Sequence, residues 1–325
     1  MNILVTGGAG YVGSVLVELL VGKGHTVVVF DNLSTGHRSA VDASARLVSG
    51  DLADAAEVER LFGDNMFNCV MHLAGPSLVE ESMREPEKYY WSNLVCGLNL
   101  LSAMMRHGNK RLVFSSSAAV YGEPDTLPIQ ENAPTEPQNP YGECKLVFEK
   151  MLYWFRIAHG LSYISLRYFN AAGATGSHGE HHVPETHLIP IVLKTAMGQL
   201  ETAEIFGVDY PTEDGTCVRD YVHVVDLAEA HILSMDALLR GKAGVFNLGS
   251  GSGYSVRQVV EMAGEVTGVA VPTKNVSRRK GDPARLVASS DKAGEMLRWK
   301  PRYSLRDMVE SSWKWMQAFP DGYPD

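Results

Sequence analysis

The first half of the chain alternates short apolar or β-branched runs with longer stretches whose apolar residues recur at helical spacing. The short runs predict strands at 3–5, 26–30, 46–48, 69–72, 111–114 and 163–166, and the longer stretches predict helices at 12–21, 55–62, 87–106 and 141–158. Strands that are apolar throughout and alternate with helices are typical of a parallel sheet with both faces covered. The pattern therefore predicts an α/β fold with a doubly wound parallel sheet of the Rossmann kind.

This alternation stops near residue 169. A stretch rich in glycine, histidine and proline covers 170–190, and a predicted helix at 191–197 leads into an irregular segment that reaches 219. Strand and helix units resume at 221–239 and 245–267, and a last helix is predicted at 304–319. Irregular segments of such folds often shape binding sites. We therefore predict a sheet domain over 1–168, to which 220–250 returns, and a smaller mixed α/β substrate-binding region over 169–219 and 251–325.

Composition narrows the partners of this fold. The 325 residues are 45% hydrophobic and 21% charged, as in an ordinary globular protein, and the formal net charge of −9 argues against nucleic acid and membrane surfaces, which need a basic face. The four cysteines lack the spacing of a zinc site or a disulfide framework, and no apolar run approaches the roughly 18 residues that span a bilayer. We therefore expect a cytoplasmic protein with reduced thiols.

A glycine-rich turn follows the first predicted strand. Gly8, Gly10 and Gly13 form G-x-G-x-x-G, and Gly7 begins an overlapping G-x-x-G-x-x-G. Glycines between a strand and a helix let the backbone approach a pyrophosphate and point the helix N-terminus at it. Asp31 ends the second strand, where an acidic residue binds the adenosine ribose and repels a 2′-phosphate. These features predict bound NAD rather than NADP.

Two later strand ends extend the predicted cofactor site. Asp51 and Leu52 follow the third strand, where they are placed to contact the adenine, although Asp51 is equally well placed to cap the next helix. Leu73 and Ala74 follow the fourth strand, where small residues allow close approach of the backbone. We therefore expect the cofactor to lie along the carboxyl ends of the strands.

The predicted chemistry centres on a serine, a tyrosine and a lysine. Ser117 follows the fifth strand, and Tyr141 and Lys145 are four residues apart at the start of a helix, so they share one face. A free tyrosine has a pKa of about 10, so a phenolate base near neutrality needs roughly 4 kcal/mol of extra stabilisation. Lys145 and a positive nicotinamide ring are expected to supply it, and Ser117 to steady the reacting oxygen.

Several longer stretches carry a family resemblance. They are 6–13, Asp31-Asn-Leu-Ser-Thr-Gly, Ser115-Ser-Ser-Ala-Ala-Val-Tyr-Gly, Asn139-Pro-Tyr-Gly-Glu-Cys-Lys, Leu166-Arg-Tyr-Phe-Asn, Pro184-Glu-Thr-His-Leu-Ile-Pro and 206–226. On these motifs the chain resembles the extended short-chain dehydrogenases, and among them most closely the UDP-glucose 4-epimerases. The resemblance spans nearly the whole chain and implies an isomerase of galactose metabolism that uses NAD to invert C4 of UDP-glucose and UDP-galactose through a 4-keto sugar.

The resemblance also implies roles for individual residues. Those implied at the cofactor are Gly7, Gly10, Tyr11, Val12, Gly13, Asp31, Asn32, Asp51, Leu52, Leu73, Ala74, Asn93, Ser115, Tyr141, Lys145 and Tyr168, with Tyr11 and Val12 at the pyrophosphate. Those implied at the UDP-sugar are Ser117, Asn170, Leu188, Arg219, Arg279 and Asp282. The two arginines offer planar cationic groups for a diphosphate, and the competing interpretation of each is a surface ion pair.

Two positions depart from the family pattern. Ser77 stands where some members carry a cofactor-binding lysine, which puts that contact in doubt. Leu286 stands where members vary between a bulky aromatic and a smaller residue, so the tolerance for N-acetylated sugars stays open. UDP-N-acetylglucosamine, UDP-xylose and UDP-glucuronate therefore remain alternative substrates.

Two other functions compete with epimerisation. Nucleotide-sugar 4,6-dehydratases place acidic residues after the strand-end serine or threonine, whereas Ala118 and Ala119 stand there in this chain. A non-catalytic NAD-sensing regulator would be marked by a degraded catalytic group, and Ser117, Tyr141 and Lys145 are all intact. Both alternatives are therefore less favoured.

The histidine-rich run and the long helices make two further predictions. His178, His181 and His182 superficially resemble a metal site, but their spacing is poor for joint ligation, so no metal is expected. The helices at 87–106 and 141–158 carry apolar residues on more than one face: Leu98, Leu101, Met105, Phe148, Leu152 and Phe155. A second apolar stripe indicates a homodimer formed through a helix bundle, and packing within one chain is the competing account.

Overall fold

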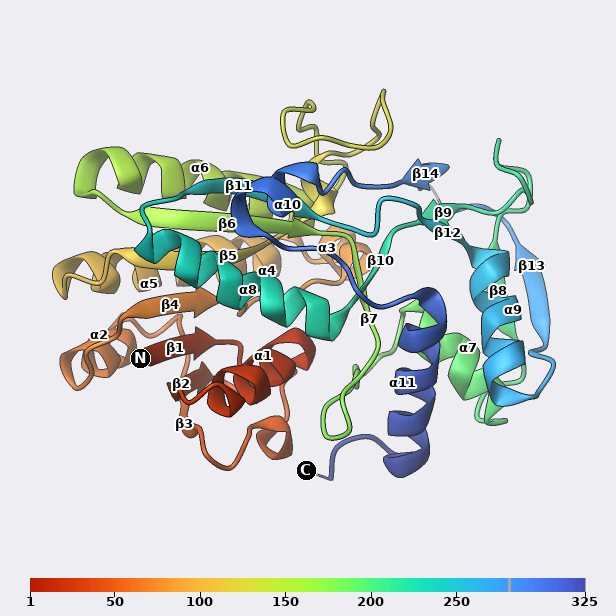
Figure 1. Ribbon diagram of the computed structural model, residues 1–325, viewed down its shortest axis with the longest axis horizontal. Coiled ribbons are helices and arrows are strands. Elements are labelled where there is room, and N and C mark those ends of the chain that lie inside the picture. Colours follow the sequence, from red (N-terminus) through yellow and green to blue (C-terminus); the bar gives the residue numbers. More distant parts are fainter. Residues whose placement is uncertain (280–281, 325) are drawn as a thin grey trace.

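The computed structural model describes residues 1–279 and 282–324, and its main feature is a seven-stranded sheet (Figure 1). All the strand pairs in this sheet are parallel. In spatial order the strands are β11 (Gly244–Leu248), β6 (Ser162–Tyr168), β5 (Arg111–Ser117), β4 (Cys69–His72), β1 (Asn2–Thr6), β2 (Thr26–Asp31) and β3 (Arg46–Ser49). All six strands predicted in the first half are present, and β5 is longer than predicted because it takes in the three serines.

Helices cover both faces of the sheet, and alternate strand residues serve the two faces. Ile3 and Val5 of β1 belong to the core under α1 (Tyr11–Gly22) and α8 (Val224–Leu239). Leu4 belongs to the core under the opposite helices, which are α2 (Ala55–Gly63), α5 (Cys96–Arg106) and α6 (Pro140–His159). Because successive strand side chains point to opposite faces, both faces of β1 are buried. This arrangement confirms the predicted doubly wound fold.

The predicted helix at 87–106 is interrupted. It begins as α4 (Pro86–Tyr90), continues as a π-helical turn, η2 (Trp91–Val95), and ends as α5. A short helix that the pattern did not predict, α3 (Val79–Arg84), precedes it. Single π-helical turns inside α-helices often occur at functional sites, and this one carries Asn93.

The remaining elements form small sheets and a helical layer beside the carboxyl edge of the large sheet (Figure 1). β7 (Asn170–Ala172) pairs with β10 (Tyr221–His223), β8 (Ala203–Phe206) with β13 (Thr273–Val276), and β9 (Val218–Arg219) with both β12 (Tyr254–Ser255) and β14 (Arg285–Leu286). The helices of this layer are α7 (Leu188–Ala196), α9 (Val256–Thr267) and α11 (Leu305–Ala318), which contact one another. Helix α10 (Asp291–Leu297) and the 3₁₀ turns η1 (Arg38–Ala40) and η3 (Ala118–Val120) lie outside it.

Most of these short strands were not predicted, because two to four residues carry too little periodicity. The structure returns β11 to the large sheet beside β6, and α10 packs against β11 and α8. The division into domains stays a prediction, and residues 280–281 and 325 of its outer range lie outside the described part of the chain. Among the described helices, none is long and apolar enough to cross a membrane.

A buried ion pair joins two neighbouring strands of the sheet and the helix that packs on them. Arg167 of β6 binds both carboxylate oxygens of Glu149 on α6, at 2.5 and 3.0 Å, and each side chain is only 6% exposed. Ser116 of β5 donates to the same carboxylate at 2.6 Å, and the Tyr121 hydroxyl accepts from Arg167 at 2.9 Å. The bidentate geometry and these added hydrogen bonds satisfy groups that burial would otherwise leave unpaired.

We predict that Arg167→Met lowers the free energy of unfolding by about 3–5 kcal/mol, because it leaves the Glu149 carboxylate buried without its counter-ion. Arg106→Met is the matched control, since Arg106 pairs with Glu59 at 2.6 Å on the surface and its loss should have little effect. Urea unfolding of the two variants measures the difference. Equal urea midpoints for both would contradict a structural role of the buried pair.

Candidate active site

The glycine turn is shaped by close contacts between strand ends. Gly7 has a φ of 74°, and a Cβ there would lie 2.5 Å from the backbone nitrogen of Ala74. A Cβ on Gly13 would lie 2.0 Å from the Gly7 carbonyl oxygen, so helix α1 also needs glycine to pack. At Gly10 the nearest atom would be 3.5 Å away, so packing does not demand glycine there. That open space at the start of α1 fits the approach of a pyrophosphate.

The next residues along α1 connect this turn to the rest of the site. Tyr11 is the first residue of α1, and its hydroxyl donates to the Gly173 carbonyl at 2.5 Å. Val12 follows it and packs against the core under α1. The turn is therefore connected to the segment that follows β7.

Asp31 lies where the sequence predicts a ribose-binding carboxylate, at the end of β2. Its two oxygens accept from the backbone nitrogens of Ala9 at 3.0 Å and Leu33 at 2.9 Å. Burial raises the pKa of Asp31, and these hydrogen bonds oppose the rise. The carboxylate thus joins the glycine turn to the loop after β2.

Asn32 and Asp51, both predicted at the adenosine, meet in the structure. The Asn32 amide donates to the Asp51 carboxylate at 3.2 Å. The alternative role of Asp51 as a helix cap is wrong, because α2 begins at Ala55 and Asp54 accepts from its first backbone nitrogens. Asp51 instead accepts from the Ala53 nitrogen, which closes the turn that also holds Leu52.

Leu73, Ala74 and Asn93 line the continuation of this edge. The Leu73 nitrogen donates to the Thr6 carbonyl at 3.0 Å, and Ala74 contacts Gly7. Asn93 is buried and donates to the Tyr89 carbonyl at 3.2 Å, but its side-chain oxygen has no hydrogen-bond partner in the described chain. A buried unpaired acceptor is costly, so its presence here fits a donor supplied by a ligand.

Ser117 and Tyr141 are brought together by a tight contact between two segments. Asn139 accepts from the Gly142 nitrogen at 2.9 Å and so caps α6 two residues before Tyr141. A Cβ on Gly142 would lie 2.4 Å from the Ala119 carbonyl oxygen, in the 3₁₀ turn that follows Ser117. Tyr141 is thereby buried within hydrogen-bonding reach of Ser117. The sequence analysis assigned Gly142 no role of its own. Its place directly after Tyr141 was the feature that could have identified it.

Burial dominates the electrostatics of Tyr141 and Lys145 in the described chain. Burial raises the pKa of Tyr141, Tyr168 raises it further, and the hydrogen bond with Ser117 only partly opposes them. Burial likewise lowers the pKa of Lys145 to about 8, and its ammonium lies 5.6 Å from the centre of the Tyr141 ring. The described residues therefore favour the neutral phenol. That Lys145 and the positive nicotinamide ring together stabilise the phenolate stays a prediction.

Two more predicted residues complete this cluster at the ends of β5 and β6. The Ser115 hydroxyl lies 2.8 Å from the His231 ring of α8, and it also hydrogen-bonds Tyr168. Tyr168 lies opposite Ser117 in the strand register. His231, which the sequence did not single out, is buried, and burial lowers its pKa to about 4. It therefore stays neutral at physiological pH.

Apart from Ser117 of β5, the predicted substrate residues lie on the smaller region beside the large sheet. Arg219 of β9 pairs with Asp282 at 2.6 Å and is largely buried. Leu286 of β14 lies opposite Arg219 in the strand register and packs with the cluster around Ala118. Arg279 is exposed, with its guanidinium 3.9 Å from the centre of the Phe206 ring. Arg219 thus makes an ion pair, but the pair is largely buried and its partner, Asp282, is itself a predicted substrate residue. This argues against the competing interpretation of Arg219 as part of a surface ion pair.

Asn170 and Leu188 lie on two other elements of that region. Asn170 begins β7, lies opposite Tyr221 of β10, and donates its backbone nitrogen to the Asp220 carbonyl at 3.0 Å. Leu188 begins α7 and is half-buried. This backbone hydrogen bond places Asn170 beside Asp220, which directly follows Arg219 in the sequence.

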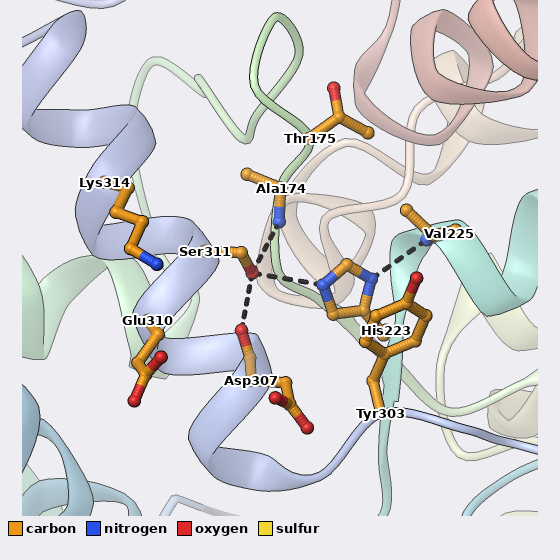
Figure 2. Close-up of a pocket in the computed structure, with 9 residues that line it drawn as sticks. All are labelled: Ala174, Thr175, His223, Val225, Tyr303, Asp307, Glu310, Ser311 and Lys314. Atoms are coloured by element: carbon orange, nitrogen blue, oxygen red, sulfur yellow. Dashed lines mark hydrogen bonds between the residues drawn. The ribbon is translucent and has the colours of Figure 1, made fainter.

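A separate cavity of about 410 Å³ lies between α11 and the start of α8 (Figure 2). His223 occupies its wall, where its ring accepts from the Val225 nitrogen at 3.1 Å and lies 3.1 Å from the Ser311 hydroxyl. The residues that line it include none of the predicted site residues. We therefore place the chemistry at Tyr141 rather than in this cavity.

Comparison with known proteins agrees with this geometry. The model of the NAD dependent epimerase/dehydratase family matches residues 3–249. The chain is 51% identical to the UDP-glucose 4-epimerase of Halalkalibacterium halodurans, over 99% of this chain and 98% of that protein. A crystal structure of a UDP-glucose 4-epimerase has a TM-score of 0.98 at 48% identity and covers 100% of both chains. The Bifidobacterium longum UDP-glucose 4-epimerase, solved with NAD⁺ and UDP, has a TM-score of 0.95 at 39% identity, over 99% of this chain and 100% of that one.

We predict that in NAD-free protein Lys145→Met stabilises the fold by up to about 3 kcal/mol at pH 7, because the buried ammonium has a pKa of about 8 instead of 10.5. A lowered lysine pKa destabilises the folded chain below pH 8, and the chain recovers stability as the pH rises from about 8 to 10.5. The advantage of the variant should therefore shrink across that range in urea unfolding curves. Lys150→Met, on the exposed side of the same helix, is the control and should show no such pH dependence.

Proposed function

The chain belongs to the NAD dependent epimerase/dehydratase family, and from this we propose that it interconverts UDP-glucose and UDP-galactose by inverting C4 of the sugar. The observation that carries the proposal is the meeting of Ser117, Tyr141 and Lys145 beside the glycine turn. A dehydratase is less well supported, because Ala118 and Ala119 offer no acid–base group after the serine. The intact triad also disfavours a non-catalytic regulator.

The cofactor is NAD, and the described residues fit it. The glycine turn and the start of α1 would hold the pyrophosphate, Asp31 and Asn32 the ribose, and the unpaired Asn93 oxygen would accept a donor from the cofactor. When bound, NAD accepts a hydride from the sugar and later returns it. No net oxidation results, so the cofactor can remain in place through the cycle.

Tyr141 would take the proton from the 4-hydroxyl of the sugar. Its buried phenol is neutral in the free protein, so it requires positive charge nearby before it acts as a base. Ser117 would hydrogen-bond the same oxygen and hold it while C4 becomes a ketone. Lys145, buried one helical turn away, would supply part of the charge and hold the ribose.

The arginines would keep the UDP in place while the sugar turns over. Arg219 is already oriented by Asp282 and by the Pro283 carbonyl at 2.9 Å, so little ordering is needed when it binds a phosphate. Arg279 would supply a second cation from the segment after β13. A 4-keto sugar tethered only through UDP can present its other face to the hydride, which inverts C4.

We further propose a homodimer through α5 and α6. Leu101, Phe148 and Leu152, predicted for this interface, pack inside the chain, so core packing accounts for those three. Leu98 is exposed, as are four others on the same helices and the π-helical turn: Trp91, Val95, Trp154 and Ile157. A stripe of large apolar side chains exposed on adjacent helices supports a second copy as its cover.

The function is tested by incubating the purified protein, without added cofactor, with C4-deuterated UDP-galactose. We expect UDP-glucose that retains the deuterium at C4, because the hydride returns to the carbon that gave it. Tyr141→Phe should retain NAD but lose activity by at least about 100-fold. Deuterium released into solvent would contradict the proposed return of the hydride to C4. Separate incubations with UDP-N-acetylgalactosamine and UDP-xylose compare the sugars that Leu286 leaves open.

The contact between Gly142 and Ala119 gives a second test of the site. Gly142→Ala inserts a methyl group 2.4 Å from the Ala119 oxygen, so Tyr141 must move away from Ser117. We predict a fall in kcat of about 10- to 100-fold with the fold retained, since small misplacements of reacting groups cost this much. Gly264→Ala in α9 is the matched control, because its Cβ would have its nearest neighbour at an ordinary 3.5 Å. Unchanged kcat in Gly142→Ala would refute the positioning role.

A further inference from the structure

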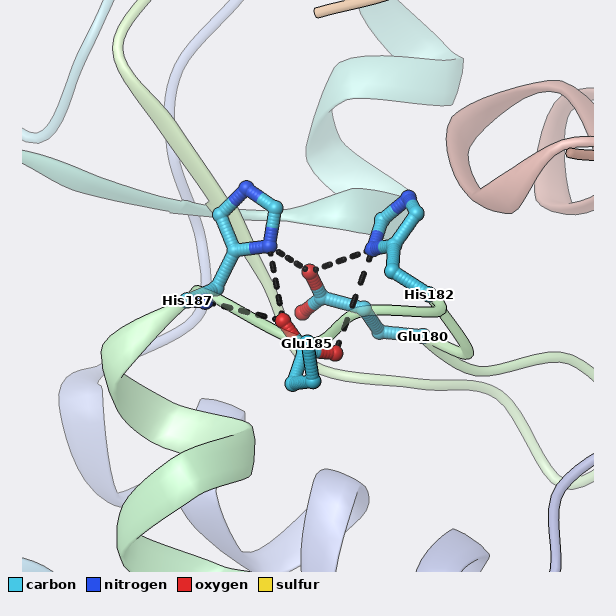
Figure 3. Close-up of side chains that lie close together, drawn as sticks. All are labelled: Glu180, His182, Glu185 and His187. Atoms are coloured by element: carbon cyan, nitrogen blue, oxygen red, sulfur yellow. Dashed lines mark hydrogen bonds and ion pairs between the residues drawn. The ribbon is translucent and has the colours of Figure 1, made fainter. Parts of the chain in front are cut away.

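The segment between β7 and α7 brings two histidines and two glutamates together, outside the site described above (Figure 3). They are Glu180, His182, Glu185 and His187, and one ligand atom from each lies within 4.8 Å of the others. This set shares Glu180 and His182 with the run at 178–182, which was judged from sequence as a poor metal site. Glu185 and His187 were not considered there, because the turn that returns them to Glu180 is not visible in the sequence.

The distances match those of a small coordination sphere. His187 Nδ1 lies 2.7 Å from the Glu180 carboxylate and 3.0 Å from that of Glu185, and His182 Nδ1 lies 3.2 and 3.9 Å from the same two groups. Ligands held about 2.0–2.2 Å from a tetrahedral zinc ion are about 3.3 Å apart. Both histidines also present the same ring nitrogen to the two carboxylates, as Figure 3 shows.

The carboxylates are held in place by other groups. Glu185 accepts from the backbone nitrogens of Thr186 and His187, both at 2.8 Å, which fixes its orientation. The side chains of Glu180 and Glu185 are only 9% and 6% exposed. Metal ligands generally need such outer hydrogen bonds, and a buried pair of carboxylates needs positive charge.

We propose that Glu180, His182, Glu185 and His187 bind one divalent transition-metal ion of the zinc class. Two neutral imidazoles and two carboxylates balance the charge of such an ion and offer the nitrogen and oxygen ligands it takes. Without a metal, the two histidines lie against the same two carboxylates, with His187 2.7 and 3.0 Å from them and His182 3.2 Å from Glu180. The ion would take the place of these direct contacts.

The position of the cluster indicates a structural role. The His182 ring lies edge-on to Tyr11 at 6.3 Å, beside the glycine turn, and His187 occupies the N-cap position of α7 immediately before Leu188. His178 of the same segment pairs with Glu18 of α1 at 3.1 Å. An ion here would fasten an irregular segment to the start of α1 on one side and to the start of α7 on the other.

The test uses untagged protein stripped with a chelator and titrated with Zn²⁺ against a chromophoric competitor, and with Co²⁺ in the spectrophotometer. We expect one equivalent of Zn²⁺, a rise in Tm on its addition, and the intense visible bands of tetrahedral Co²⁺. His182→Ala should weaken zinc binding by at least about 100-fold, since even outer-shell changes cost 10- to 100-fold. His107→Ala, which removes a histidine paired with Glu59 at 2.7 Å, should bind zinc like the wild type.

Wild-type protein that binds no zinc and shows only octahedral Co²⁺ would overturn the proposal and leave an ion-pair cluster. Equal weakening in His107→Ala would overturn it as well, because the metal would then lie elsewhere. If His182→Ala fails to fold, the Co²⁺ spectrum of the wild type still decides. None of these readouts depends on the epimerase reaction, so the two proposals can fail separately.

Discussion

The active site depends on the buried ion pair between Glu149 and Arg167. It joins α6 to β6, and Ser116 ties β5 to the same carboxylate. These three elements carry the predicted reacting groups Ser117, Tyr141 and Lys145, and also Tyr168, which is predicted to lie at the cofactor. Ser117 follows Ser116, Tyr168 follows Arg167, and Lys145 lies one helical turn before Glu149. Removing one partner would leave a charge in the core, so the pair holds the elements in one relative position.

Burial of Tyr141 and Lys145 disfavours the charged forms that the proposed proton transfer needs. It raises the pKa of Tyr141 and lowers that of Lys145, so both groups tend toward their neutral forms. A site of this kind is not a strong base by itself. Positive charge near the phenol would favour the phenolate, and an oxidised nicotinamide would bring such charge. Under the proposed mechanism, proton removal would then be restricted to the protein that holds its oxidised cofactor.

The sequence predicted the large sheet and most of the cofactor edge because both depend on local pattern. Apolar strands, glycines and strand-end polar residues are visible without tertiary information. Asp51 shows the limit: it and Asp54 both suit a helix cap, and only the path of the chain gives that role to Asp54. Gly142 was visible only as part of a motif. Glycine is required there because of the close contact with Ala119, which lies more than 20 residues away in the sequence. The short strands β8, β9 and β12–β14 were not predicted, because pairing rather than periodicity defines them.

The segment between β7 and α7 shows why irregular chain resists prediction and still positions function. It has little regular structure of its own, so its place depends on side chains that bind neighbours: His178 to α1, Gly179 to the Tyr323 hydroxyl at 3.0 Å, and the Glu–His cluster to itself. The contacts of His178 and Gly179 join residues that are more than 100 positions apart, so their sequence separation does not indicate their distance. Through these contacts the predicted pyrophosphate turn at Tyr11 and the predicted substrate helix at Leu188 share one support. A change in that support would therefore alter the predicted cofactor and substrate sites together. None of its residues is proposed to take part in the hydride transfer.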